Sequence, residues 1–158
     1  MKNRLTAYTI LIASISGQLF ALKYFRFFPD LTFLYTVFFG IFYGPYEGAV
    51  MGLAAGFLRA CFSVGTSGLD MFMLPVTAYV SYLFSELFYK KNPLFQVLMS
   101  LSGFVFFISA QAFFLGGVYD LDMKLTDVLS ESRWQISLTV LAAPFIFPLW
   151  CGILRTGE

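Results

Sequence analysis

The sequence predicts an all-α integral membrane protein, in which six transmembrane helices pack into one bundle. Hydrophobic residues make up 59% of the 158 positions, whereas charged residues make up only 12% and aromatic residues 20%. A soluble domain carries about 25% charged residues, so a soluble fold of this size would leave a large apolar surface exposed. Six spans of about 20 residues use roughly 120 positions. We therefore expect a single transmembrane domain over residues 1–158.

The first half of the chain contains three predicted spans. The first, residues 5–22, follows two basic residues like a signal peptide, but another apolar run comes soon after it, so we interpret it as a retained span. The next apolar stretch is divided at Gly44-Pro45, because proline lacks an N–H and disfavours a helical residue before it. This predicts short helices at 29–43 and 47–62. They either cross the membrane or form a re-entrant pair, which would leave five spans.

The second half contains three more apolar runs, which predict spans at 69–89, 94–119 and 134–153. The polar segment 120–133 has apolar residues at helical spacing, which predicts an amphipathic helix on the membrane surface. A solvated connector is the alternative. Equal numbers of positive residues are predicted on the two sides of the membrane, so the charge count alone does not set the orientation of the protein. Because the first span usually dominates, we expect both termini in the cytoplasm.

The sequence lacks the residues that most enzymes and metal sites use. It has no histidine, the commonest metal ligand and general base. Its two cysteines lie far apart in apolar stretches, where they are expected to be small buried hydrophobic residues. The 10 basic and 9 acidic residues balance, so charge gives no indication of a nucleic-acid partner. We predict a protein that is not an enzyme and binds no metal or cofactor.

Small residues recur at intervals of four, which places them on one face of a helix. Such faces let helices approach closely in lipid, where packing drives association. The longer series is predicted to be a helix-packing stripe: Gly44, Gly48, Gly52 and Gly56. The shorter series, on the first span, is predicted to be a face for a partner helix: Ala13, Gly17 and Ala21.

A few polar residues lie in or beside the apolar spans, where they usually mark function. We expect an external polar rim of Asp30, Arg59 and Asp70. Arg59 is unusual because it lies within an apolar run, from which it either extends to the surface or pairs with Asp70. Glutamines placed like Gln18 and Gln111 more often make interhelical hydrogen bonds than bind a ligand, so we expect interhelical hydrogen bonds here.

Several short motifs carry a family resemblance. They are Pro29-Asp30-Leu31, Tyr43-Gly44-Pro45, Glu47-Gly48, Gly52, Gly56, Gly65 and Gly68-Leu69. This pattern resembles the rod shape-determining protein MreD family, most strongly over residues 29–93. Many members carry an aspartate shortly after the last glycine, where this chain has Arg59-Ala60-Cys61. Any contact made by that aspartate is therefore lost here or inverted in charge.

The resemblance implies a bacterial inner-membrane protein whose fold is similar to the S-components of energy-coupling-factor vitamin transporters. It also implies a non-enzymatic role in cell elongation, beside MreC, MreB and the RodA–penicillin-binding-protein synthase. Our hypothesis is a membrane scaffold that binds MreC and positions peptidoglycan synthesis. The alternative is a vitamin-like small-molecule binder, with an outward cavity lined by Tyr79, Gln111, Tyr119 and Trp134.

Overall fold

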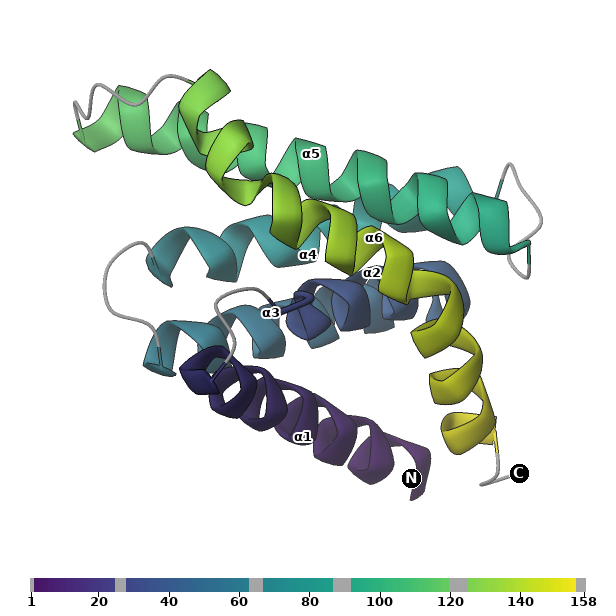
Figure 1. Ribbon diagram of the computed structural model, residues 1–158. Helices are drawn as coiled ribbons and strands as arrows, with labels where there is room; N and C mark the ends of the chain where they lie inside the picture. Colours follow the sequence, from purple (N-terminus) through teal and green to yellow (C-terminus); the bar gives the residue numbers. More distant parts are fainter. Residues whose placement is uncertain (1, 25–27, 63–66, 87–91, 120–124, 156–158) are drawn as a thin grey trace.

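The computed structural model describes residues 2–24, 28–62, 67–86, 92–119 and 125–155, which form six helices and no strand (Figure 1). The helices are α1 Lys2–Tyr24, α2 Leu31–Tyr43, α3 Pro45–Phe62, α4 Ser67–Ser85, α5 Pro93–Tyr119 and α6 Leu125–Arg155. The predicted all-helical class with six helices is confirmed for these residues. The end of the predicted fourth span, residues 87–89, lies outside the described residues.

Two of the six helices have the length and apolar composition needed to cross a membrane. In α5 this segment is Pro93–Phe114, and in α6 it is Arg133–Leu154, each 22 residues long. The apolar parts of α1 and α2 are shorter, at Leu5–Ala21 and Leu31–Tyr43. The crossing of all six helices therefore stays a prediction.

Helix α2 lies at the centre of the bundle, where it contacts each of the other five helices. Every residue from Thr32 to Ile41 is buried, as expected for a helix that is apolar on all sides. Its aromatic side chains pack against those of later helices. The Phe33 ring lies 4.8 Å from the Phe104 ring, and the Phe38 ring lies 5.6 Å from the Phe147 ring. Part of the aromatic content of the sequence thus forms one core around α2.

The chain reverses direction between α2 and α3 at Gly44. This residue has a φ of 96°, a left-handed conformation that favours glycine, and a side chain placed there would meet no atom within 4 Å. Pro45 is the first residue of α3, where its missing N–H costs no hydrogen bond. Gly44 therefore provides the turn, whereas the three later glycines of its series provide the packing face.

Helices α3 and α4 approach each other almost backbone to backbone along this glycine face. A Cβ added at Gly52 would lie 2.9 Å from the Pro75 backbone, and one at Gly56 would lie 2.6 Å from the Met71 Cα. Gly48, one turn earlier, is also buried but packs mainly against α2, since a Cβ there would lie 2.8 Å from the Gly40 Cα. These distances leave no space for a side chain, so the glycines set the separation of the two helices.

Helix α6 runs continuously from Leu125, so the polar residues from 125 onward belong to its first turns. Residues 120–124 of the predicted surface segment lie outside the described residues. Pro144 and Pro148 lie inside this helix, and its C-terminal part turns away from the direction of its first part (Figure 1). Proline inside a helix removes a backbone hydrogen bond and bends the helix, as the sequence predicts here.

Candidate functional site

The three residues of the expected polar rim meet in one cluster. The Arg59 Nη1 atom lies 2.7 Å from the Asp30 Oδ2 atom, and the Arg59 Nε atom lies 3.0 Å from the Asp70 Oδ2 atom. Both carboxylates are buried, whereas the Arg59 side chain is 26% exposed. We call these three residues the Arg59 cluster. The structure thus joins Arg59 to Asp70, one of the two alternatives that the sequence left open.

Local structure places each member of the Arg59 cluster. Asp30 is the N-cap of α2, and its Oδ1 atom accepts a hydrogen bond of 3.0 Å from the Phe33 N–H. Asp70 lies in the first turn of α4, where a carboxylate complements the positive end of the helix dipole. Arg59 lies in the last turn of α3, where a cation is favoured in the same way. The charges are therefore favourable locally before they pair with one another.

Residues from the other helices complete the network around the Arg59 cluster. The Gln111 Nε2 atom of α5 donates a hydrogen bond of 2.5 Å to Asp70 Oδ1. The Asp30 backbone N–H donates one of 2.8 Å to the Thr139 hydroxyl of α6. On α1, Gln18 Oε1 accepts hydrogen bonds from the backbone N–H and the hydroxyl of Thr32, at 3.3 and 3.0 Å. Polar contacts therefore tie all six helices together at one end of the bundle.

Gln18 and Gln111 make the interhelical hydrogen bonds that the sequence predicts for them. Thr32 and Thr139, in contrast, were not predicted as members of the network. Nothing in the local sequence distinguishes them from other threonines in apolar helices. Their roles depend on which helix lies opposite.

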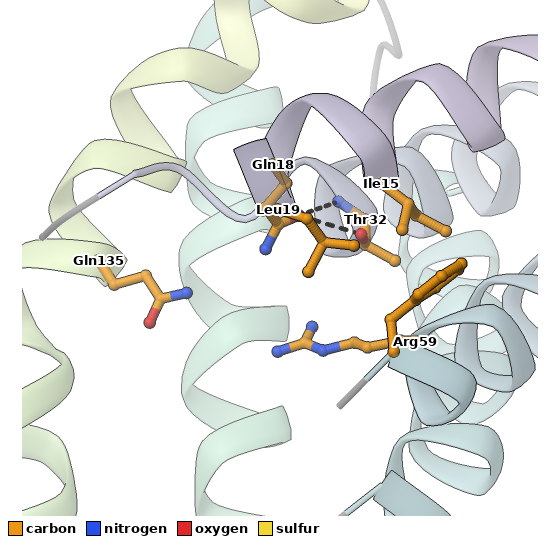
Figure 2. A pocket seen from close by; sticks show the side chains of 7 residues that line it. Ile15, Gln18, Leu19, Thr32, Arg59 and Gln135 are labelled. Atoms are coloured by element: carbon orange, nitrogen blue, oxygen red, sulfur yellow. Dashed lines mark hydrogen bonds between the residues drawn. The ribbon is translucent and has the colours of Figure 1, made fainter. Parts of the chain in front are cut away.

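A cavity of about 170 Å³ opens beside the Arg59 cluster. Its lining combines four polar side chains with three apolar ones: Gln18, Thr32, Arg59, Gln135, Ile15, Leu19 and Phe62. In Figure 2 the Arg59 side chain extends across the cavity toward Gln135, with Gln18 and Thr32 on another side. The cavity therefore offers hydrogen-bond donors on several walls, and its remaining walls are apolar.

The described residues hold no group of three potential metal ligands among cysteine and acidic side chains. Each carboxylate of the Arg59 cluster is already engaged by the guanidinium and by another hydrogen bond. Such an arrangement suits structural organisation and hydrogen bonding to a ligand rather than proton transfer, which needs a carboxylate facing the reacting group.

The predicted partner-helix face lies on the outside of the bundle. Ala13 and Gly17 are exposed, and Ala21 is half-buried. A Cβ added at Gly17 would meet no atom within 4 Å. The opposite side of α1 packs inward through buried residues such as Leu11 and Ile15. Ala13 and Gly17 are therefore not used in close packing against the described part of this chain.

Of the four residues expected to line a vitamin-like cavity, the three whose side chains the structure describes line no common pocket. Tyr79 is 50% exposed and Trp134 is 56% exposed, whereas Gln111 bonds to Asp70. The side chain of Tyr119 lies outside the described residues. A cavity with polar walls lies instead beside Arg59.

Fold and site together define an all-helical bundle with two helices suited to a membrane, held by a buried charged network. A family model for the rod shape-determining protein MreD matches residues 5–156, so the chain belongs to the MreD family. No curated protein and no solved structure gives a significant match. Family membership supports a role as a membrane protein that determines rod shape. The likeness to vitamin-transporter S-components stays a prediction.

Proposed function

We propose that this protein is a non-enzymatic scaffold of the bacterial cell-elongation complex. In this proposal it lies in the cytoplasmic membrane with both termini in the cytoplasm, binds MreC, and positions peptidoglycan synthesis. Membership of the MreD family supports the role in rod shape. The outer face of α1 supports binding through a partner helix.

The observation that carries the proposal is the contrast between two sets of small residues. Gly52 and Gly56 of α3 pack against α4, since a Cβ at either position would lie within 3 Å of α4 backbone atoms. Gly17 of α1 likewise leaves the helix backbone uncovered by a side chain, yet a Cβ added there would meet no atom within 4 Å. Small residues allow close contact between membrane helices, so the α1 face fits a helix from another protein.

The test is co-purification of MreC with the full-length protein after Gly17→Leu. We expect this variant to weaken the complex about tenfold, equivalent to about 1.4 kcal/mol, because leucine prevents close helix contact. Gly152→Leu is the matched control, because it adds the same side chain to α6 at a position where a Cβ also meets no atom within 4 Å. Both variants are expected to retain the elution volume and thermal stability of the wild type in detergent.

Gly52→Leu serves as a folding reference, because its side chain would collide with the Pro75 backbone and disrupt the bundle. An unchanged yield of MreC with a folded Gly17→Leu protein would refute docking on α1. An equal loss with Gly152→Leu would show that the effect is not specific to the α1 face.

A further inference from the structure

The cavity beside Arg59 presents N–H donors that the described residues do not use. A guanidinium has five N–H groups, and the two ion pairs engage Nε and Nη1. The carbonyl end of Gln18 is turned to Thr32, so its amide nitrogen is directed to the other side, as Figure 2 shows. Gln135 adds a second amide from α6. These groups would bind an oxygen atom that accepts hydrogen bonds.

The local charge selects among such acceptors. Arg59 contributes one positive charge, and Asp30 and Asp70 contribute two negative charges, so the formal sum of the cluster is −1. A phosphate or carboxylate in the cavity would add negative charge beside carboxylates whose counter-ion is already shared. A neutral carbonyl or hydroxyl oxygen accepts the same hydrogen bonds without this repulsion.

The apolar walls and the position of the cavity indicate what carries that oxygen. Ile15, Leu19 and Phe62 would contact a hydrocarbon group attached to it. Gln18 is six residues before the end of α1, a depth of about 9 Å along the helix. In a membrane-spanning bundle this depth is close to the boundary between the hydrocarbon core and the polar headgroups. Lipid ester groups, which join apolar chains to glycerol, lie at this boundary.

We propose that the cavity beside Arg59 binds the glycerol-ester part of a membrane lipid, with preference for lipids that carry no net charge. The cavity volume of about 170 Å³ is similar to that of an engineered cavity that holds benzene, so about six non-hydrogen atoms fit. The three carbons of a glycerol backbone and one ester group (O–C=O) together have six non-hydrogen atoms. The acyl chain would leave the cavity along its apolar side.

Native mass spectrometry of the full-length protein in detergent, titrated with defined lipids, tests this site. We expect diacylglycerol and dioleoyl-phosphatidylethanolamine to bind more tightly than anionic dioleoyl-phosphatidylglycerol. Gln135→Leu removes one hydrogen-bonding group and should weaken retention of the preferred lipid about fivefold. Leu19→Trp, which fills the cavity from a half-exposed position, should have at least the same effect. Ser137→Leu is the matched control, because it lies on the same helix outside the cavity.

A separate titration with triacetin, a soluble glycerol ester, distinguishes a free small molecule from a lipid. Tighter binding of triacetin than of diacylglycerol would overturn the lipid assignment. Equal or tighter binding of phosphatidylglycerol would overturn the charge argument. If both cavity variants fold and retain the lipid as well as Ser137→Leu, the lipid does not bind in this cavity. Weak triacetin binding, together with loss of lipid in both cavity variants, is the result we expect.

Discussion

Removing the positive charge of the Arg59 cluster is the most direct test of how this bundle is held together. Arg59→Met retains much of the apolar stem but removes the group that contacts Asp30 at 2.7 Å and Asp70 at 3.0 Å. The formal charge of the cluster changes from −1 to −2, carried by two buried carboxylates. Removing one partner of a buried ion pair costs about 3–5 kcal/mol. Because the Arg59 side chain is 26% exposed, we expect the low end of this range, about 3 kcal/mol.

The assay is the free energy of unfolding of the purified protein in mixed detergent micelles, followed by circular dichroism. Arg133→Met is the control, because the exposed Arg133 side chain lies over the Trp134 ring at 5.9 Å, a contact worth less than about 1 kcal/mol. A triple variant that adds Asp30→Asn and Asp70→Asn to Arg59→Met removes all three charges. It should recover most of the lost stability, since no uncompensated charge remains.

Two results would refute this reasoning. If Arg59→Met changes the unfolding free energy by no more than Arg133→Met does, the ion pairs contribute little to stability. If the triple variant is no more stable than Arg59→Met, the loss comes from packing of the Arg59 side chain rather than from uncompensated carboxylates.

Two further predictions concern single positions, both measured by the same unfolding assay. Gly56→Ala should lower the free energy of unfolding by about 1–3 kcal/mol, because its methyl group would lie 2.6 Å from the Met71 Cα. Gly17→Ala should instead raise it by up to about 1 kcal/mol, because alanine favours the helix and meets no other atom there. Equal changes in the two variants would contradict the assigned faces. Asp30→Ala should be less stable than Asp30→Asn by about 1 kcal/mol, because only asparagine can still cap α2; equal stabilities would show that the cap contributes nothing.

The parts of the fold that follow from local chemistry could be predicted from the sequence. Gly44-Pro45 predicts a break between two helices, because proline lacks an N–H and disfavours a helical residue before it. The structure has α2 and α3 joined there, with a positive φ at Gly44. The regular spacing of glycines predicts a close helix contact, although only the structure shows that α4 is the neighbour. Whether Arg59 extends outward or pairs with Asp70 also depends on that neighbour. The choice between the surface and a tertiary partner is not encoded in local spacing.

The threonines of the network show why the rest could not be predicted. A threonine inside an apolar helix usually donates its hydroxyl to a backbone carbonyl four residues earlier, as Thr36 does to Thr32 and Thr77 does to Met73. Thr139 instead accepts a hydrogen bond from the backbone of Asp30, 109 residues away. The same residue type in the same local setting makes either contact. The difference arises only when α6 packs beside the start of α2.

The two faces of α1 have opposite roles, and this bears on how the proposed scaffold would work. On the inner face, Gln18 bonds to Thr32, and the Ala7 carbonyl accepts a hydrogen bond of 2.6 Å from the Tyr35 hydroxyl. These contacts hold α1 against α2 near both ends, while Gly17 faces outward. A face that is already ordered loses less conformational entropy when a partner binds. Because Gln18 also lines the cavity beside Arg59, an occupant of that cavity would contact the helix that carries the proposed docking face.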